Sequence, residues 1–383
     1  MNAGRNPVVL ATGGTGGHIF PAQALAVELR QRDYGLVLIT DRRGFNVGSS
    51  IDQIETYRVQ AAGVSGRGLA GRLSATAQLG IGLAQAHMIL RRLRPSAVVG
   101  FGSYASVPSV LAASFLSIPT VIHEQNAVLG RANRFLARRA TRVATAFESV
   151  SELGETQLEK ATWTGNPVRP DIVSVRNSPY PSPGKEGPLR LLVTGGSQGA
   201  HVFSTVVPAA LATLNAPLRA RLRVSQHCRP EDQATVSKGY RDAGIDCDVS
   251  TFFDDMAERF AATHLLICRA GASTMAELTT AGRPAILVPY PHAIDNHQSE
   301  NAARLCDAGG GWMIQEEAFT PEVLSNRLNS LLSPPAKLDI AARCAAKIGM
   351  PDAATRLAEL VTGLIGTNGA NVRSSKPAME AMG

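Results

Sequence analysis

A glycine-rich segment that ends in a histidine is the first part of the chain that could do chemistry. The sequence ATGGTGGHIFPA occupies residues 11–22 and follows the apolar run Val8–Leu10. Glycines let backbone N–H groups approach a ligand closely, and a loop between a strand and a helix directs those groups at an anion. The segment therefore predicts a phosphate-binding loop. His18, whose ordinary pKa lies near 6.5, is a candidate general base or a hydrogen-bond donor to that phosphate.

Three later segments also gather polar side chains where a predicted strand ends. They are HEQNAVLGRAN at 123–133, CRAGASTMAEL at 268–278 and DNHQSENA at 295–302. Polar groups at the carboxyl ends of parallel strands favour a ligand site. A second interpretation stays open, because Thr274–Glu277 and Asp295–Gln298 both match a capping box and could serve only to start helices.

The glycine loops do not fit the common nucleotide-binding motifs. A dinucleotide site requires GxGxxG or GxGxxA, and here Ile19 stands where the helix must approach the strand closely. The second glycine segment, Gly196–Gly199, has a different spacing, and no GxxxxGK[ST] motif occurs. Asp41, just after the second predicted strand, leaves a dehydrogenase as an alternative. Adjacent aspartates in FFDDM, at 252–256, are typical of a helix start and not of a metal site.

Short apolar runs separated by helix-length segments indicate how these loops are positioned. The runs are Val8–Leu10, Leu36–Ile39, Ala97–Val99, Thr120–Ile122, Leu189–Val193, His264–Ile267 and Ala285–Val288. Such runs are typical of strands buried on both faces of a parallel sheet in an α/β protein. ATGGTGG at 11–17 is echoed by VTGGSQG at 193–199. The echo predicts two facing Rossmann-like domains with a cleft between them.

A proline-rich stretch separates the two halves. It contains six prolines between residues 165 and 188 and is typical of an interdomain linker. The expected organisation is an N-terminal domain at 1–170, a linker at 171–188, a C-terminal domain at 189–350, a C-terminal helix at 351–365 and a disordered tail at 366–383.

The composition is that of a globular protein whose charge is unevenly spread. Hydrophobic residues make up 44% of the 383 residues and charged residues 18%, which excludes a disordered chain. Five cysteines without a CxxC pair indicate reduced thiols, and no signal-peptide pattern opens the chain. Two uncharged stretches, 95–122 and 191–218, are interrupted by prolines and glycines, so neither is expected to span a membrane. Lys and Arg exceed Asp and Glu by eight over residues 1–170, whereas the remainder carries −1, which predicts an anionic partner for the first half.

Eight of these segments occur in the order and form of one known family. They are GGTGGHIFPA, GSYASVP at 102–108, HEQNAVLGRAN, GNPVR at 165–169, GGSQGA at 195–200, FFDDM, CRAGASTMAE and DNHQSENA. From about residue 7 to about residue 360 the chain resembles the MurG family of bacterial N-acetylglucosaminyltransferases. Ser103 departs from the family pattern, which usually has a glycine there, and the tail after about residue 365 is unmatched. The resemblance implies a GT-B fold.

The resemblance also implies an activity. The family moves GlcNAc from UDP-GlcNAc to the C4 hydroxyl of MurNAc in undecaprenyl-diphospho-MurNAc-pentapeptide (lipid I), forming the lipid II of peptidoglycan synthesis. An α-linked donor that yields a β-1,4 bond requires inversion in one displacement, with a base for the hydroxyl proton and groups that stabilise the leaving diphosphate. His18 and Glu124 are the two candidate bases, and no metal or cofactor is implied. A UDP-GlcNAc 2-epimerase of similar fold and a non-catalytic scaffold of the wall-synthesis complex are the alternatives.

Carried over residue by residue, the resemblance implies a donor site and an acceptor site. The donor residues are Thr15, Gly16, Gly17, Asn126, Arg169, Ser197, Phe253, Arg269, Ala272, Ser273, Thr274, Met275, Ala276, Glu277 and Gln298. The acceptor-side residues are Gly13, Gly14, Ser103, Tyr104, His123 and Asn133. Glu277 is expected to accept both ribose hydroxyls, and Phe253 to bind uracil through its backbone. Ser197 and Arg269 are expected to hold the diphosphate.

A lipid-linked acceptor implies contact with a membrane. Residues 67–94 combine apolar residues at helical spacing with five arginines, a pattern that also fits a helix facing the core. The charge excess of the first half favours reversible, peripheral binding to an anionic surface, here the cytoplasmic face of the inner membrane. Arg67, Leu69, Arg72 and Leu73 are expected nearest the lipid. Other wall-synthesis and division proteins are candidate partners, and no nucleic acid is expected.

Overall fold

The computed structural model describes residues 6–13, 16–41, 54–61, 69–184, 186–196, 199–332 and 336–374, with the backbone alone described for 69–73 and 367–374. The chain forms two compact units. The first unit contains Met1–Gln125, Leu129–Pro167 and Asp352–Gly383, and the second contains Asn126–Val128 and Val168–Pro351. Three residues of the HEQNAVLGRAN segment thus belong to the second unit.

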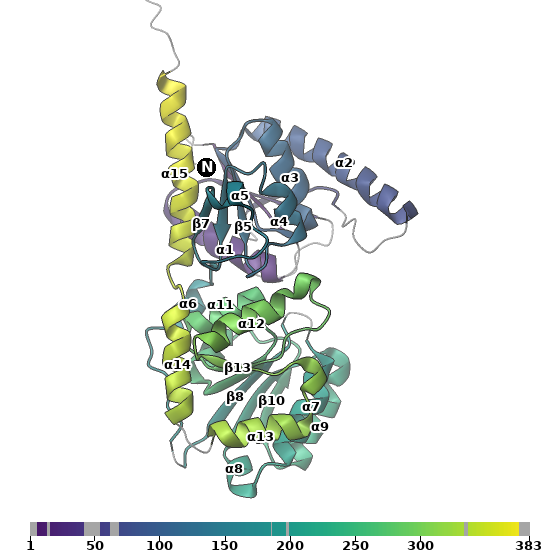
Figure 1. Ribbon diagram of the computed structural model, residues 1–383, viewed down its shortest axis with the longest axis vertical. Coiled ribbons are helices and arrows are strands. Elements are labelled where there is room, and N and C mark those ends of the chain that lie inside the picture. Colours follow the sequence, from purple (N-terminus) through teal and green to yellow (C-terminus); the bar gives the residue numbers. More distant parts are fainter. Residues whose placement is uncertain are drawn as a thin grey trace, which may run out of the picture. The chain divides into compact units, whose positions relative to one another are not determined.

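A seven-stranded parallel sheet forms the centre of the first unit (Figure 1). Its order is β3-β2-β1-β4-β5-β6-β7. The strands are β1 Val8–Ala11, β2 Leu36–Thr40, β3 Glu55–Arg58, β4 Ala97–Gly100, β5 Thr120–Glu124, β6 Arg142–Thr145 and β7 Ala161–Trp163. The strand order reverses between β1 and β4, and ligands of open α/β sheets bind at the carboxyl edge of such a reversal. A ligand site is therefore expected at the loops that follow β1 and β4.

Helices cover both faces of this sheet. They are α1 Gly16–Gln31, α2 Leu69–Leu93, α3 Ser103–Phe115, α4 Arg131–Leu136, α5 Glu155–Leu158 and α15 Ala353–Ser374. Val8 of β1 packs in one cluster with Leu25 of α1 and Leu357 of α15. The next residue, Val9, packs in the opposite cluster with Leu90 of α2. Neighbouring side chains of β1 thus enter two different cores, since side chains of a strand alternate between its faces.

The second unit is built around a six-stranded parallel sheet of order β10-β9-β8-β11-β12-β13. Its strands are β8 Leu189–Thr194, β9 Leu222–His227, β10 Asp246–Ser250, β11 Leu265–Cys268, β12 Ala285–Leu287 and β13 Gly311–Met313. Its α-helices are α6 Pro170–Val175, α7 His201–Ala212, α8 Ala216–Ala220, α9 Gln233–Asp242, α10 Met256–Ala262, α11 Ala272–Thr280, α12 His297–Asp307, α13 Pro321–Leu332 and α14 Ala336–Ile348. One-turn 3-10 helices lie at Pro230–Asp232, Ile294–Asn296 and Glu316–Ala318.

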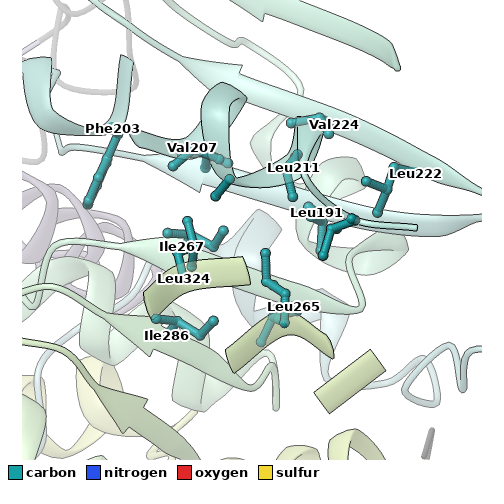
Figure 2. Packing of buried hydrophobic residues seen from close by; sticks show 14 of the residues in the cluster. Leu191, Phe203, Val207, Leu211, Leu222, Val224, Leu265, Ile267, Ile286 and Leu324 are labelled. Carbon is teal, nitrogen blue, oxygen red and sulfur yellow. The ribbon is translucent and has the colours of Figure 1, made fainter. Parts of the chain in front are cut away.

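Aliphatic side chains from the sheet and its helices fill one core of the second unit (Figure 2). Leu191 and Leu265 of the sheet pack in one cluster with Val207 and Leu211 of α7 and with Leu324 of α13. None of the five is more than 1% exposed. Burying one such side chain stabilises the fold by about 1.5–3 kcal/mol. This core holds the carboxyl ends of β8 and β11 rigidly, and the glycine loop and the CRAGAS loop begin there.

All seven predicted apolar runs overlap a strand, whereas six further strands among the described residues were not predicted. The missed strands are β3, β6, β7, β9, β10 and β13. Four of them (β3, β7, β10 and β13) lie at the edges of the two sheets. Edge strands need little apolar sequence because one side of their ladder meets solvent. The sequence DCDVS of β10, for example, contains two exposed aspartates.

Helices occupy part of the predicted linker and part of the predicted tail. Helix α6 occupies the start of the linker, and further along it the hydroxyl of Tyr180 donates to the carbonyl of His264 (2.7 Å), so this segment packs as part of the second unit. Helix α15 packs on α1 and continues to Ser374, through the first nine residues of the expected tail. Extending a formed helix adds one hydrogen bond per residue fixed, and the next proline is Pro377. Among the described residues no helix is both long and apolar enough to cross a membrane.

Candidate active site

The loop after β1 lies beside the loop after β4 in the first unit. A Cβ atom at Gly13 would lie 2.6 Å from Oγ of Ser103. A Cβ atom at Gly102 would lie 3.4 Å from both Cε1 and Nδ1 of His18. Gly102 and Ser103 have left-handed backbone, with φ of 74° and 61°. The positive φ at Gly102 favours glycine, and the imidazole of His18 packs directly against this turn.

Glu124 ends β5 and is held by two N–H donors. It is 1% exposed. Its Oε2 accepts from the backbone N–H of Gly130 and from Nδ2 of Asn133, each at 2.9 Å. Nδ2 of Asn133 also donates to the carbonyl of His123 (3.1 Å) and lies near Gly102. These donors compensate the burial of the carboxylate and fix its orientation.

His123 is fully buried in a chain of hydrogen bonds. Its Nε2 donates to the carbonyl of Gly165 (2.9 Å), so its Nδ1 accepts from Nε2 of Gln125 (3.1 Å). The same Gln125 nitrogen donates to the carbonyl of Phe101 (3.0 Å). Burial lowers the pKa of His123 to about 4. The imidazole is therefore neutral near pH 7, and it orients the end of β5 without exchanging protons.

In the second unit, Arg169 and Glu277 form an ion pair. Nη2 of Arg169 lies 3.3 Å from Oε1 of Glu277, and their side chains are 26% and 12% exposed. Burial raises the pKa of Glu277, and the charge of Arg169 opposes that rise. The capping-box interpretation of Thr274–Glu277 is wrong, because α11 already begins at Ala272 with Gly271 as its N-cap. The carboxylate is thus directed at Arg169 and not at the start of its own helix.

The capping-box interpretation of Asp295–Gln298 is also wrong. Helix α12 begins at His297, and its N-cap residue Asn296 has left-handed backbone (φ 53°) and no side-chain cap bond. A capping side chain needs extended backbone to reach the first amides of the helix. Oε1 of Gln298 instead accepts from the backbone N–H of Tyr290 (2.9 Å), which ties α12 to the loop after β12.

A fully buried amide joins two of the polar segments. Oδ1 of Asn301 accepts from the backbone N–H of Ala127 (2.9 Å). Its Nδ2 donates to Oδ1 of Asn126 (3.1 Å) and to the carbonyl of Ala270 (3.0 Å). Asn301 is 0% exposed. It therefore holds Asn126 against the loop that leads into α11.

Arg269 is engaged by protein groups. It is 8% exposed, and its Nη1 donates to the carbonyls of Val288 (3.1 Å) and Pro289 (3.2 Å). Its Nη2 pairs with Glu316. That the guanidinium of Arg269 holds the diphosphate stays a prediction, and a diphosphate there would share it with these protein groups. A cation on this buried edge of the sheet is most stable where carbonyls and a carboxylate surround it, and there it joins the loops after β11 and β12.

Two family models match most of the chain. The glycosyltransferase family 28 N-terminal domain matches residues 8–145, and the C-terminal domain of that family matches residues 190–357.

The chain belongs to glycosyltransferase family 28.

Its curated relatives in this family share one name. A protein from Paramagnetospirillum magneticum is 52% identical over 365 residues, which cover 95% of this chain and 98% of the relative. A protein from Zymomonas mobilis is 45% identical over 361 residues, covering 94% and 93%. Both are named UDP-N-acetylglucosamine–N-acetylmuramyl-(pentapeptide) pyrophosphoryl-undecaprenol N-acetylglucosamine transferase. The family 28 domains and these relatives make the chain a hexosyltransferase.

Solved structures agree with this family assignment. MurG from Acinetobacter baumannii matches with a TM-score of 0.73 and 31% identity, covering 93% of this chain and 99% of that one. A UDP-N-acetylglucosamine 2-epimerase matches with a TM-score of 0.65 but only 13% identity, so it shows the fold alone. The predicted GT-B fold is confirmed by these matches and by the two parallel α/β sheets.

The other residues expected of a family 28 site are unevenly exposed. Ser273, Thr274 and Ala276 are half-buried on α11, and Ala272 begins that helix. Met275 is 3% exposed and packs in the core, so only its backbone could meet a ligand. Tyr104 is half-buried in the first turn of α3, and Gly16 and Gly17 begin α1. Gly14, Thr15 and Ser197 lie outside the described residues.

The described part of this family 28 chain offers no metal centre. It contains no group of three or more His, Cys, Asp and Glu side chains that could hold an ion. The aspartates of FFDDM start α10 as predicted, with Asp255 at the N-cap. The five cysteines are free.

Sequence reasoning missed two buried amides of this site, Gln125 and Asn301. Asn301 carried a signal, because it lies beside Ala302 and one turn before Leu305 on the buried face of α12. A polar residue on an apolar helix face must find hydrogen-bond partners inside the fold. Gln125 carried no comparable signal, since its neighbours in the sequence are polar as well.

Proposed function

We propose that this enzyme transfers GlcNAc from UDP-GlcNAc to the C4 hydroxyl of MurNAc in undecaprenyl-diphospho-MurNAc-pentapeptide, forming a β-1,4 bond and lipid II. The names of the relatives supply the substrates. The observation that carries the chemistry is the half-buried imidazole of His18 beside the turn at Gly102 and Ser103. A hydroxyl nucleophile needs a nearby base to accept its proton, and histidine is the side chain best suited to this near neutral pH. His18 lies at the carboxyl edge of the central strands, where a ligand is expected.

The reaction is a single displacement. The C4 hydroxyl oxygen attacks C1 of GlcNAc while its proton passes to His18. The bond from C1 to the diphosphate oxygen breaks, and UDP leaves with the electron pair. Attack from the face opposite the leaving group inverts the anomeric centre. His18 is preferred to Glu124 as the base because Glu124 is 1% exposed and its Oε2 already accepts from two N–H groups.

The donor site is assigned to the second unit. The carboxylate of Glu277 accepts the ribose hydroxyls, for which it exchanges its bond with Arg169. Arg169 then faces the diphosphate, as a guanidinium suits phosphate oxygens. The first-turn N–H groups of α11, the helix that begins after Gly271, add to this anion site. Asn126, fixed by Asn301, and Gln298 contact the sugar.

The enzyme is further proposed to bind the cytoplasmic face of the inner membrane as a peripheral protein. The side chains first expected at the lipid, Arg67, Leu69, Arg72 and Leu73, lie outside the described residues. Later on α2, Ile81 and Met88 are 48% and 65% exposed, and on the neighbouring α3 Phe115 is 61% exposed. Three large exposed apolar side chains on adjacent helices, followed by the arginines at 91, 92 and 94, suit an anionic bilayer surface.

Release of UDP tests the proposed reaction. The enzyme is incubated with UDP-GlcNAc, with and without a lipid I analogue, and UDP and sugar products are measured. UDP release that requires the analogue, with a disaccharide product, supports the transferase. UDP-ManNAc formed without acceptor would make the chain an epimerase, and no turnover with either would make it a scaffold.

Flotation tests the membrane proposal. The enzyme is mixed with anionic or neutral vesicles, and Met88→Ser/Phe115→Ser is compared with wild type. If wild type binds anionic vesicles in a salt-sensitive way and the variant does not bind, the result supports these side chains as the membrane-binding surface. Equal binding to both vesicle types would contradict its electrostatic part.

A further inference from the structure

One side of the Phe253 ring is covered by an arginine. Cζ of Arg259 lies 3.7 Å from the centroid of that ring. Phe253 is 7% exposed, whereas the preceding Phe252 is 62% exposed. A guanidinium at this distance is attracted by the electron-rich face of the ring and excludes water from it. Arg259 thus holds Phe253 in place in the loop between β10 and α10.

The guanidinium of Arg259 is itself fixed through all three of its nitrogens. Nε donates to Oδ1 of Asp255 (2.7 Å) and Nη2 to Oδ2 of Asp248 (2.6 Å). Nη1 donates to Oγ of Ser225 (2.8 Å). The partners come from the start of α10, from β10 and from β9. The side chain of Arg259 is 17% exposed, and its position is fixed by contacts with β9, β10, the start of α10 and the ring of Phe253.

We infer that Arg259 is a positioning residue for nucleotide-base selection, which fixes the backbone of Phe253 against the pyrimidine of the donor. The inference rests on the proposed function and on the expectation, drawn from the family resemblance, that the backbone of Phe253 binds uracil. Arg259 acts only through Phe253 and is assigned no contact with the donor.

The chemistry of the two pyrimidines explains why a fixed backbone matters. Uracil presents a carbonyl at C4 and an N–H at N3, whereas cytosine presents an amino group at C4 and an unprotonated N3. A backbone N–H and C=O that match uracil are therefore left unpaired by cytosine. Such a mismatch discriminates strongly only if the backbone cannot move to relieve it, because hydrogen bonds tolerate a few tenths of an ångström.

A neighbouring ion pair in the same groove provides the matched control. Nε of Arg223 lies 2.9 Å from Oδ2 of Asp246. Both residues line a groove of about 320 Å³ together with Asp248, Asp255 and Arg259. Arg223 makes its pair from β9 to β10 at the far end of these strands from the Phe253 loop. Replacement of Arg223 therefore removes one arginine from the groove but leaves Arg259 on the ring of Phe253.

Calorimetric titration with UDP and with CDP tests the inference. The proteins are wild type, Arg259→Met, Arg259→Lys and the control Arg223→Met, each checked for folding by its thermal melting point. We expect wild type and Arg223→Met to prefer UDP strongly. Arg259→Met should bind UDP about tenfold more weakly and lose most of its preference for UDP over CDP. Arg259→Lys keeps the charge but not the planar stack, so it should fall between the two.

Two results would overturn the inference. In the first, Arg259→Met or a folded Arg259→Lys keeps the UDP-to-CDP preference of wild type, with or without weaker binding, and Arg259 then only stabilises the fold. In the second, Arg223→Met loses the preference as fully as Arg259→Met, and the effect then belongs to the charge of the groove. A wild-type protein that does not prefer UDP would instead contradict the proposed donor, and with it the basis of the inference.

Discussion

The two units each hold one buried glutamate at a predicted site, and the two carboxylates are stabilised in different ways. Glu124 of the first unit is 1% exposed and accepts from two neutral N–H groups. Glu277 of the second unit retains 12% side-chain exposure and pairs with a guanidinium that is 26% exposed. Hydrogen bonds from neutral, buried donors hold one geometry. A partly exposed ion pair gains little from its own Coulomb energy and is easily exchanged for a ligand.

The difference supports our proposal that Glu124 maintains the geometry of its site, whereas Glu277 binds the donor. Near Glu124, Nδ2 of Asn133 donates to the carbonyl of His123, and both ring nitrogens of the neutral His123 are hydrogen-bonded. We therefore propose the half-buried His18 as the proton acceptor. The partner of Glu277, Arg169, is partly exposed, so a ligand can replace it at the carboxylate. The predictions below, in decreasing order of effect, test this contrast.

Replacement of His18 should have the largest effect. His18→Ala should lower kcat by about 10²–10⁴, since a positioned general base contributes that much, and the acidic limb of the pH–rate profile should disappear. Glu124→Gln keeps the shape of the side chain and should retain the limb. Steady-state kinetics between pH 5 and 9 measure both. If His18→Ala kept the limb while the acceptor KM rose, His18 would be a phosphate ligand and Glu124 the base.

Replacement of Glu277 should act on the donor. Glu277→Ala should raise the KM for UDP-GlcNAc roughly 10- to 100-fold, because charge-assisted hydrogen bonds to a buried group contribute about 1.5–3 kcal/mol. The acceptor KM should change little. Unchanged donor KM and kcat would show that Glu277 serves the fold alone and would end the contrast with Glu124.

Replacement of Arg169 should change the pH dependence of donor binding. Burial raises the pKa of Glu277 and Arg169 lowers it, so Arg169→Met should raise that pKa further. Nearby Asp171 also raises it. Protonation removes the charged acceptor, so the donor KM of the variant should begin to rise at a higher pH than in wild type as the pH falls. The double variant Arg169→Met/Glu277→Gln should show no such rise of the donor KM. If Arg169→Met alone also showed no shift of this rise, the pairing of Arg169 with Glu277 would be contradicted.

Replacement of Thr274 should have the smallest effect. Because Gly271 and not Thr274 precedes the first turn of α11, no cap is lost. Thr274→Ala should change the free energy of unfolding by less than about 0.5 kcal/mol, as is usual away from caps and cores, whereas loss of a cap costs about 1 kcal/mol. Urea denaturation distinguishes the two values. A loss near the larger value would restore the capping-box interpretation.

Local sequence patterns determined the central strands and the glycine loops that follow them. Val8–Leu10 is apolar throughout, and Leu189–Val193 is apolar except for the exposed Arg190, because a central parallel strand is buried on both faces. The edge strands β3 and β10 were not predicted because they are polar, and an edge strand can be polar since it meets solvent where a second neighbouring strand would lie. The motif order also sufficed for the family, since eight spaced segments carry more information than any one glycine loop.

Only the tertiary structure decided what each polar side chain does. In the sequence, Arg269 and Arg169 look alike, as cations near the donor loops. In the structure, buried Arg269 contacts Glu316 and two backbone carbonyls, whereas Arg169 pairs with Glu277. Nothing near Arg259 in the sequence shows that it covers Phe253. Hydrophobic periodicity is set by neighbours along the chain, whereas hydrogen-bond partners come from elements that are distant in sequence and brought together at the ends of the strands. Their pairing, and the pKa and exposure that follow from it, therefore arises only when the sheets and helices pack.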